Sequence, residues 1–335
     1  MSKILIIGSG FIGSSLASWL SKWFSVKVAD WVETSLDHSI EFVKCDIRNV
    51  DALEQVAAGA ELLIHTAIIQ IPRINDERRL GYEVNVKGTE NVCEVVRASP
   101  SLKGMILVGS WHTMGERKIS GLVDETFGWR PDMVEERARI YALSKVAQES
   151  IVRLFAEESL NKVYGVIRIG TALGANMPSK TAANIFIDQA LKGEPLTPYQ
   201  HSMHRPMLYV YVDDICRAFE SYGEKIIEGT FQKTGSSLAE VVNVFYPRPL
   251  TILELAKTVA RDVRRISKGK IVPEVKIVSD PQKPIFKASS KNLIRVNVSK
   301  SRKLLGLKKL TSPEEAIAKI ITLRLNGAKR RLNEN

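Results

Sequence analysis

The chain has 335 residues, of which 44% are hydrophobic and 25% charged, and its formal net charge is +11. This length and composition are typical of a globular protein with a large core, and no apolar run reaches the ~18 residues of a membrane span. The three cysteines, Cys45, Cys93 and Cys216, are scattered and form no Cys-x-x-Cys pair, so we expect reduced thiols in a cytoplasmic protein, no metal site and no contact with a membrane.

The first predicted element is a strand at residues 4–7, which a glycine turn joins to a helix. Four consecutive apolar residues are typical of a strand buried on both faces, and they begin too early for a signal peptide to precede them. Gly8, Gly10 and Gly13 follow with the spacing G-x-G-x-x-G, and apolar residues then recur at helical spacing. In this context the glycines permit a sharp turn, close approach of a pyrophosphate to the backbone, and tight helix packing. The stretch therefore predicts a dinucleotide-binding turn.

A second predicted strand, at residues 26–30, ends in Asp30. A carboxylate at this place can accept hydrogen bonds from the ribose hydroxyls of the adenosine, and it repels a 2′-phosphate. No Arg or Lys follows closely. These residues favour NAD over NADP as the cofactor; the alternative is that Asp30 is a solvated strand end.

Short apolar strands continue to alternate with helical patterns as far as Arg168. We expect strands at 42–45, 61–65, 104–109 and 163–168, and helices at 50–58, 88–96 and 141–158. This alternation predicts an α/β fold with a doubly wound parallel sheet, a Rossmann fold, in which ligands lie beyond the carboxyl ends of the strands.

The pattern changes after Arg168, where Gly, Pro, Asn and Ser become frequent. We expect a smaller lobe, interleaved with late elements of the first domain: helices at 183–191, 215–222, 252–263 and 313–323, and strands at 207–212 and 241–245. Residues 1–170 with about 207–245 form the predicted NAD-binding domain. Residues 171–206 and about 246–328 form the predicted substrate-binding lobe, and residues 329–335 a basic tail.

Tyr141 and Lys145 lie four residues apart, on one face of the predicted helix at 141–158. A neighbouring ammonium favours the phenolate, so we expect the pKa of Tyr141 to be lowered and its oxygen to act as a base. Ser110 follows the strand at 104–109 and can meet Tyr141 at the same edge of the sheet. The three residues predict a hydride-transfer site in which Tyr141 takes a hydroxyl proton, Ser110 positions the oxygen and Lys145 holds the cofactor ribose.

With these motifs the chain resembles the extended short-chain dehydrogenases/reductases, the NAD-dependent epimerase/dehydratase family that includes UDP-glucose 4-epimerase. The likeness runs nearly end to end. The matching segments are Gly10-Phe11-Ile12-Gly13, Asp46-Ile47-Arg48, His65-Thr66-Ala67, Asn85-Val86-Lys87-Gly88-Thr89-Glu90-Asn91, the trio Ser110, Tyr141 and Lys145, Arg168, Arg205 with Tyr211-Val212-Asp213-Asp214, and Val298-Ser299-Lys300 with Leu304-Leu305-Gly306.

The resemblance also implies roles for individual residues. The cofactor contacts that it implies, beyond the glycines, Asp30, Tyr141 and Lys145, are Phe11, Ile12, Asp46, Ile47, Thr66, Ala67 and Asn85. Arg205 is implied to meet a substrate phosphate. The family's pairing mode implies a homodimer through helices at about 87–97 and 141–158.

Several positions depart from the family pattern. Either Ile6 and Ile7 stand where the usual turn has Thr-Gly, or one residue is deleted there. Met114 stands where the segment after the catalytic Ser has a Tyr. Trp111 and His112 occupy the places that hold Asp-Glu in sugar 4,6-dehydratases, so the missing carboxylate argues against that reaction.

The substrate site is expected to include His112, Thr171 and Arg205. Thr171 replaces an Asn that many sugar-nucleotide epimerases carry. His112 is either a second acid/base or a hydrogen-bonded wall of the pocket. His201 and His204 are expected to be loop residues or, alternatively, contacts to a phosphate or sugar. Metal ligation is not expected, because no acidic cluster accompanies them.

The favoured function is an NAD-dependent nucleotide-sugar epimerase. One alternative is a dehydrogenase or reductase of the same superfamily that acts on a non-sugar alcohol or ketone, similar to 3β-hydroxysteroid dehydrogenase. Another is a non-catalytic NAD-binding protein, against which the intact trio speaks. We interpret the basic clusters at 261–270 and 329–331 as solvated surface or, alternatively, as groups that attract an anionic substrate. Nucleic-acid binding is disfavoured because no aromatic platform accompanies these clusters.

Overall fold

The computed structural model describes residues 1–34, 36–159, 161–231 and 239–333. Its main feature is a seven-stranded sheet in the order β11-β7-β5-β4-β1-β2-β3, in which every neighbouring pair is parallel. The strands are β1 (Lys3–Ile7), β2 (Ser25–Asp30), β3 (Glu41–Lys44), β4 (Leu62–His65), β5 (Gly104–Ser110), β7 (Val163–Ile169) and β11 (Glu240–Val244). The predicted α/β fold with a doubly wound parallel sheet is confirmed.

Helices cover both faces of this sheet, which explains the uninterrupted apolar runs in its strands. Ile4 and Ile6 of β1 point into the core shared with α1 (Phe11–Leu20) and α8 (Val212–Ile227). Leu5 and Ile7 point to the other face, which α2 (Val50–Ala57), α5 (Gly88–Ala98) and α6 (Arg139–Glu158) cover. Successive residues of one strand thus enter two different cores.

Short elements link the strands to these helices. Between β4 and α5 the chain forms α3 (Arg73–Asp76), α4 (Arg78–Tyr82) and the π-helical turn η1 (Glu83–Lys87). Between β5 and α6 it forms η2 (Trp111–Met114), β6 (Gly121–Val123) and η3 (Glu136–Ala138). The second linker carries residues that the site uses.

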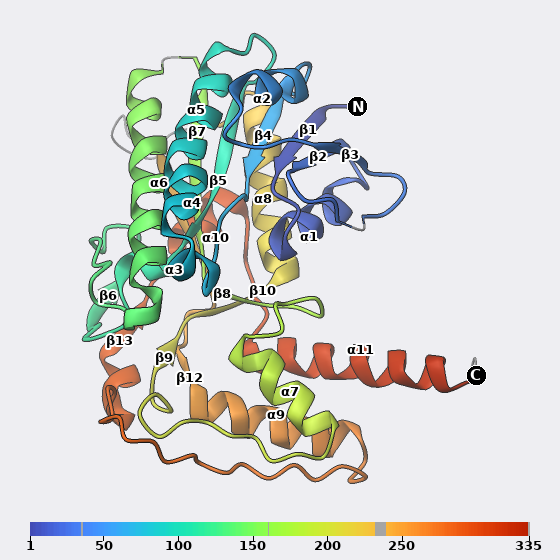
Figure 1. The fold of residues 1–335 in the computed structure, drawn as a ribbon, viewed down its shortest axis with the longest axis vertical. Helices are drawn as coiled ribbons and strands as arrows, with labels where there is room; N and C mark the ends of the chain where they lie inside the picture. Colours follow the sequence, from blue (N-terminus) through green and yellow to red (C-terminus); the bar gives the residue numbers. More distant parts are fainter. Residues whose placement is uncertain (35, 160, 232–238, 334–335) are drawn as a thin grey trace.

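The smaller lobe lies beyond the carboxyl ends of the sheet strands (Figure 1). Its helices α7 (Ala182–Leu191) and α11 (Pro313–Asn333) both pack against α9 (Ile252–Ile266). Helix α11 continues through residues 329–333, which the sequence analysis assigned to a basic tail; residues 334–335 lie outside the described part of the chain.

The predicted strand at 207–212 is wrong as one element, because it divides between two small sheets. β9 (Pro206–Met207) pairs antiparallel with β12 (Leu250–Thr251), and β10 (Tyr209–Tyr211) pairs parallel with β8 (Thr171–Leu173). The carbonyl of Leu208 accepts a hydrogen bond of 2.7 Å from the Thr171 backbone, which turns the chain from one ladder to the other. Val212 already begins α8, with two aspartates in its first turn.

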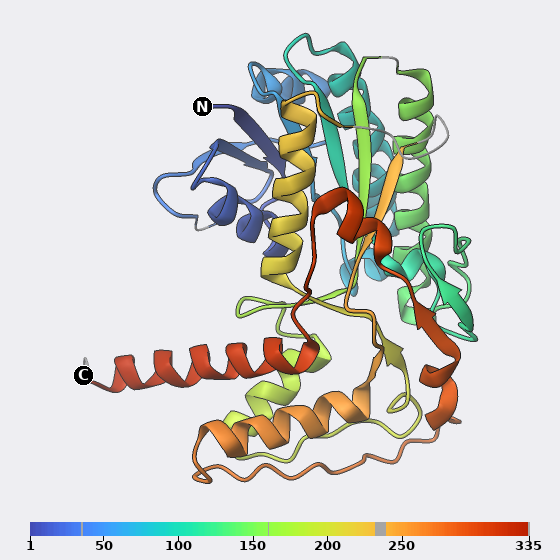
Figure 2. The same ribbon diagram turned by 180° about the vertical axis from the view of Figure 1, so that it is seen from behind.

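The chain crosses between the two parts repeatedly. After α9 an extended segment runs along the lobe and forms bridges at Leu196–Val275 and Tyr199–Val278. The chain then passes η4 (Ala288–Leu293), β13 (Ile294–Val296), which pairs with β6, and α10 (Ser299–Leu305), which packs against α8 and β11 (Figure 2). Among the helices described, none has the length and apolarity needed to cross a bilayer.

Candidate functional site

The glycine turn joins β1 to α1 with contacts that leave no room for side chains at two of its glycines. Gly8 has φ +101°, and a Cβ there would lie 2.5 Å from Thr66 Oγ1. A Cβ at Gly13 would lie 1.9 Å from the Gly8 carbonyl oxygen. The Thr66 hydroxyl donates to the carbonyl oxygens of Ile7 and Gly8, at 3.0 and 2.8 Å, and so holds the turn.

Gly10 has different surroundings. A Cβ on Gly10 would meet no atom within 4 Å, and Gly10 directly precedes the first turn of α1. Phe11 and Ile12 open the helix and are partly buried against the core. The open space in front of these N–H groups fits a pyrophosphate.

A hollow next to the turn gathers many of the residues expected to bind the adenosine half of the cofactor. Gly8, Asp30, Asp46, Ile47 and Ala67 all line it, between the ends of β1, β2 and β4. The fit to NAD therefore rests on two features of this chain: the open space at Gly10 and this hollow beside it.

Two carboxylates border this hollow. The Asp30 carboxylate accepts hydrogen bonds from the Ser9 backbone, at 2.6 Å, and from the Ser9 hydroxyl, at 2.9 Å, and remains partly exposed. The hydrogen bonds of the Arg48 guanidinium lower the pKa of Asp46. Both side chains thus line the hollow where ribose or adenine would lie.

Asn85 lies apart from the exposed surface of this site. Its side chain accepts from the Ile69 backbone N–H at 2.7 Å and donates to the Ile69 carbonyl and to Ser144, both at 3.1 Å. The residue is fully buried. It ties the segment after β4 to α6, so we assign it a positioning role, and a direct contact with the cofactor remains a prediction.

The structure brings together the three residues expected to be catalytic. Ser110 ends β5, and its side chain lowers the pKa of Tyr141 against the larger effect of burial. Lys145 follows one turn later on α6 and donates to the Val108 carbonyl of β5 at 2.8 Å. The trio therefore lies at the carboxyl edge of the sheet, where ligands of this fold bind.

The expected direction of the Tyr141 pKa is wrong in this structure. Burial raises the pKa of Tyr141 to about 12, and the side chain of Ser110 opposes that shift without cancelling it. Burial also lowers the pKa of Lys145 to about 7, so its ammonium is a weaker source of positive potential than the spacing implied.

His112 directly adjoins the trio and contacts protein atoms through both ring nitrogens. Its Nδ1 lies 3.2 Å from the Ser110 hydroxyl, and its Nε2 lies 3.2 Å from a Glu116 carboxylate oxygen. Its ring meets the Tyr141 ring edge to face, with centroids 5.7 Å apart. The sequence analysis missed Glu116, although the four-residue spacing from His112 is a signal that was available.

Glu116 is almost completely buried, with 2% of its side chain exposed. Burial alone would raise its pKa, but the His112 hydrogen bond, the His112 charge and the Arg205 charge together lower it to about 2. Its second oxygen also accepts from the Glu135 backbone at 3.3 Å. Glu116 is therefore an ionised carboxylate in the interior of the site.

The side chains of the other two residues expected to contact the substrate are paired with protein groups. Arg205 is buried, and its guanidinium lies 2.6 Å from the Glu135 carboxylate. The Thr171 hydroxyl accepts a hydrogen bond of 3.1 Å from the Trp111 indole N–H. Both residues lie near His112 through these partners, and the charge of Arg205 is offset by Glu135 although its Nε has no hydrogen-bond partner among the described residues.

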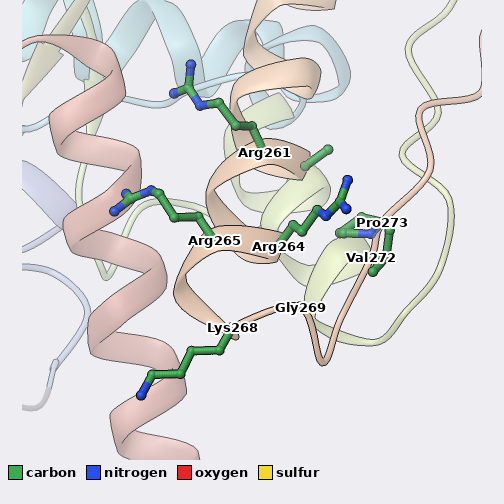
Figure 3. Close-up of a pocket in the computed structure, with 8 residues that line it drawn as sticks. Arg261, Arg264, Arg265, Lys268, Gly269, Val272 and Pro273 are labelled. Atoms are coloured by element: carbon green, nitrogen blue, oxygen red, sulfur yellow. The ribbon is translucent and has the colours of Figure 1, made fainter.

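A second, wide hollow of about 630 Å³ lies in the smaller lobe, away from the trio. Figure 3 shows Arg261, Arg264 and Arg265 extending from the C-terminal half of α9, and Lys268 from the turn that follows it, around this hollow. Asp262 pairs with two of these arginines at 3.2 and 3.5 Å. This basic surface lies at the end of the molecule farthest from the sheet (Figures 1 and 2), so it contributes no charge to the predicted active site.

The two histidines expected in the substrate loop, His201 and His204, both lie in turns of that segment. His201 pairs with Asp280 at 2.5 Å and ties the loop to the extended segment that follows α9. Across residues 1–34, 36–159, 161–231 and 239–333, no group of three or more potential ligands is arranged to hold a metal ion.

Comparisons with known proteins agree with this geometry. Tetraketide alpha-pyrone reductase 1 of Arabidopsis thaliana is 28% identical over 242 residues, 64% of this chain and 70% of that protein. Uronate dehydrogenase of Pseudomonas syringae pv. tomato is 24% identical over 182 residues, 53% of this chain and 60% of that protein. The solved structure of UDP-glucuronic acid 4-epimerase from Bacillus cereus, in complex with UDP-glucuronic acid and NAD, has a TM-score of 0.75 and 20% identity, covering 96% of this chain and 99% of that one.

The family assignment rests on a longer match. Residues 4–230, which include the glycine turn, Ser110, Tyr141, Lys145 and Arg205, match the family described as NAD dependent epimerase/dehydratase. The cofactor of this family is NAD, in agreement with the turn, the hollow beside it and Asp30. The chain belongs to the NAD dependent epimerase/dehydratase family.

Proposed function

We propose that the chain is an NAD-dependent oxidoreductase that interconverts a small secondary alcohol and the corresponding ketone. The observation that carries this proposal is the placement of Ser110 at the end of β5 opposite Tyr141 and Lys145 of α6, with Lys145 bonded to Val108 of β5, at the edge of the sheet where the cofactor hollow opens. NAD, when bound, supplies the acceptor for the hydride.

The residues of the chain divide the remaining work. Ser110 accepts or donates a hydrogen bond at the substrate oxygen and so fixes the reacting carbon. Tyr141 removes the hydroxyl proton in the direction of oxidation and returns it in the direction of reduction. Lys145, one turn further along α6, places positive charge near the Tyr141 oxygen and the cofactor ribose.

Two contacts favour a net oxidoreductase over the nucleotide-sugar epimerase that the family resemblance implies. Arg205, the expected phosphate ligand, is neutralised by Glu135 at 2.6 Å. Thr171, the expected sugar contact, is held by the Trp111 indole. A reductase and a dehydrogenase among the relatives support the same choice.

A nucleotide-sugar epimerase is the second candidate. It is favoured by the fold, since the Bacillus cereus 4-epimerase matches this chain over nearly its full length, including the smaller lobe. For this function Arg205 would have to exchange the Glu135 carboxylate for a diphosphate. A cofactor bound in the hollow would take up and give back the hydride with no net change, while Tyr141 would return the proton to the sugar oxygen.

A substrate panel distinguishes the candidates. Purified protein and NAD are incubated with uronic acids, other small secondary alcohols, UDP-glucose, UDP-galactose and UDP-glucuronic acid, while NADH is followed by absorbance and products by chromatography. We expect NADH to accumulate with a non-nucleotide alcohol. Replacing the proton-transfer group in Tyr141→Phe lowers that rate by at least about 100-fold, whereas Tyr82→Phe, at a tyrosine that is 62% exposed, leaves it unchanged.

Each other outcome of the panel has a meaning. An isomeric sugar nucleotide formed without NADH, and lost in Tyr141→Phe, replaces the oxidoreductase by the epimerase. Bound NAD with no turnover of any compound rejects both for these substrates and favours a binding protein.

A further inference from the structure

The positive charge of the protein is concentrated in one segment of the chain, which begins with α9. Residues 251–310 contain 16 lysines and arginines but four aspartates and glutamates, an excess of twelve positive charges. The whole chain has a net charge of +11, so the rest of the molecule is almost neutral as a whole. A concentration of one sign of charge on part of a surface attracts partners of the opposite sign.

The most densely charged part of this segment is the C-terminal half of α9 with the chain that follows it. Residues 261–277, which we call the basic tip, lie at the end of the molecule farthest from the sheet (Figures 1 and 2). The exposed basic residues of the basic tip are Arg261, Arg264, Arg265, Lys268, Lys270 and Lys276. Several of them extend around the wide hollow, whose wall also includes Val272 and Pro273 (Figure 3).

The acidic residues of the basic tip leave most of this charge uncompensated. Asp262 is buried and pairs with two of the arginines, at 3.2 and 3.5 Å. Glu274, the other acidic residue of the tip, is exposed. Across the described ranges of the chain, no carboxylate pairs with Arg264, Lys268 or Lys270. These three cations are therefore available to an external anion.

Large apolar side chains are exposed among the basic residues. Val272 is 64% and Ile277 46% exposed. Further along the same extended segment, Ile285 is 37% exposed and stands between two exposed lysines, Lys283 and Lys287. Single exposed apolar residues are normal on a protein surface, but here they recur with the cations along one segment. Such a surface combines electrostatic attraction with apolar groups that can leave water.

We propose that the basic tip docks the protein on the surface of an anionic lipid bilayer. The lipid phosphates pair with Arg264, Lys268 and Lys270, while Val272 and Ile277 enter the boundary between headgroups and acyl chains. Each basic residue close to an anionic leaflet strengthens binding about fivefold. The sequence analysis expected no contact with a membrane, since the chain has no apolar span, but a peripheral contact of this kind needs none.

The composition of the segment favours a bilayer over a nucleic acid, the other polyanion that a basic surface attracts. Single-stranded nucleic acids are held by bases that stack on exposed aromatic side chains. Phe286 is the sole aromatic residue in 251–310, and it is 5% exposed. The exposed side chains are aliphatic instead, which suits the acyl boundary of a membrane.

The proposed docking is independent of the proposed oxidoreductase function. The cofactor hollow lies between the ends of β1, β2 and β4, whereas the basic tip lies at the far end of the smaller lobe (Figure 1). Docking at the tip therefore leaves the hollow open to solution. The NAD affinity of a tip variant, measured without lipid, then shows whether that variant is correctly folded.

The test is co-sedimentation of the full chain with lipid vesicles. One set of vesicles contains phosphatidylcholine alone, and the other contains equal parts of phosphatidylcholine and phosphatidylserine. We expect the protein to sediment with the mixed vesicles and to stay in solution with phosphatidylcholine alone. Binding is expected to weaken as salt is added, because salt screens the attraction between the cations and the lipid phosphates.

Two sets of substitutions separate the charged and the apolar contributions. Arg264→Gln combined with Lys268→Gln and Lys270→Gln is expected to weaken binding to the mixed vesicles about 100-fold, as three losses of about fivefold imply. Val272→Ser combined with Ile277→Ser is expected to weaken binding at least about tenfold and to leave its salt dependence unchanged. The NAD affinity of both variants is expected to stay within about twofold of the wild type.

The matched control removes the same charge elsewhere. Lys44→Gln combined with Lys87→Gln and Lys118→Gln alters three exposed lysines of the sheet domain and is expected to change vesicle binding less than about twofold. No binding to the mixed vesicles, or an equal loss in this control, overturns the proposal.

A labelled DNA oligonucleotide, single-stranded or double-stranded, provides the second probe. Binding of DNA that the three tip substitutions abolish, with no binding to vesicles, replaces the bilayer by a nucleic acid. A failure of the substrate panel rejects the proposed function and leaves the vesicle result standing, because sedimentation requires no turnover.

Discussion

Gly10 and Gly13 lie three residues apart in the same turn and face opposite surroundings. A side chain at Gly13 would collide with the Gly8 carbonyl oxygen at 1.9 Å, whereas a side chain at Gly10 would enter open space. One glycine therefore serves the packing of α1 on β1, and the other serves the approach of the pyrophosphate. The two roles are separable by experiment.

We expect Gly13→Ala to lower the free energy of unfolding by about 1–3 kcal/mol, as overpacking does in well-packed interiors. Gly10→Ala, with φ −62° and ψ −171° at an allowed backbone geometry, is expected to unfold at the wild-type temperature. Its NAD affinity falls at least tenfold, because the new methyl group occupies the phosphate space. Thermal unfolding without cofactor and calorimetric titration with NAD measure the two effects. Equal destabilisation by both substitutions would contradict the division of roles.

Helix α6 places three ionisable side chains, Tyr141, Lys145 and Glu149, on its buried face at intervals of four residues. Glu149 is buried, which would raise its pKa, but Arg168 and Arg153 pair with it and lower the pKa. Lys145 has a carbonyl as its hydrogen-bond partner, and burial lowers its pKa to about 7. Burial of Lys145 therefore lowers the stability of the folded protein, and the residue is retained for its function.

This cost predicts a pH dependence of stability for the cofactor-free protein. Between pH 7 and the usual lysine pKa of ~10.4 the unfolded chain binds the proton more strongly than the folded chain. Stability therefore rises as the pH rises through this window, and the contribution is lost as the pH falls to 7. We expect Lys145→Met to be more stable than the wild type at pH 7 and to show a flatter slope. Denaturant titrations at several pH values measure this; Lys257→Met, on the exposed side of α9, is the control and keeps the wild-type slope.

The sequence predicts the helices and strands whose apolar residues follow a clear pattern. It misses the elements that form only by pairing with residues distant in the chain. Runs such as 4–7 and 163–168 are apolar enough to identify buried strands without further information. β8 is only three residues long. The segment at 207–212 divides because its first part pairs with β12 and its second part pairs with β8. No local pattern carries that information.

The same contrast holds in the site. The glycine turn, Asp30, Ser110, Tyr141 and Lys145 were available from motifs of fixed spacing. Glu116 could have been found from its four-residue spacing from His112, whereas Glu135 lies in the irregular linker between β5 and α6 and gains its partner when the chain folds back at Arg205. The sign of the Tyr141 pKa also needed the structure, because burial outweighs the nearby lysine.

At the scale of the whole molecule, α6 lies at the outer side of the sheet domain next to α5 (Figure 1). Leu143 and Leu154 on α6 are 50% and 52% exposed, and Ala147 and Ser150 between them are partly exposed. The spacing of these four residues places them on one stripe of the helix. This stripe matches the face through which the family resemblance implies a homodimer.

We expect the wild type to have the mass of a dimer in light scattering coupled to size-exclusion chromatography. Leu143→Glu combined with Leu154→Glu places two charges on the stripe and is expected to give a monomer that stays folded by circular dichroism. Leu293→Glu combined with Leu323→Glu, at two leucines that are 59% and 55% exposed elsewhere, is expected to leave the dimer intact. A wild-type monomer would rule out pairing through this face.

The packing of α10 against α8 and β11 has a consequence for synthesis of the protein. β11 is the edge strand of the sheet, and unpaired strand edges bind other chains readily. The ribosome makes β11 first, then most of the smaller lobe, and then α10. Domains usually fold one after another as they emerge from the ribosome. Here β11 lacks its packing against α10 until most of the polypeptide has been made.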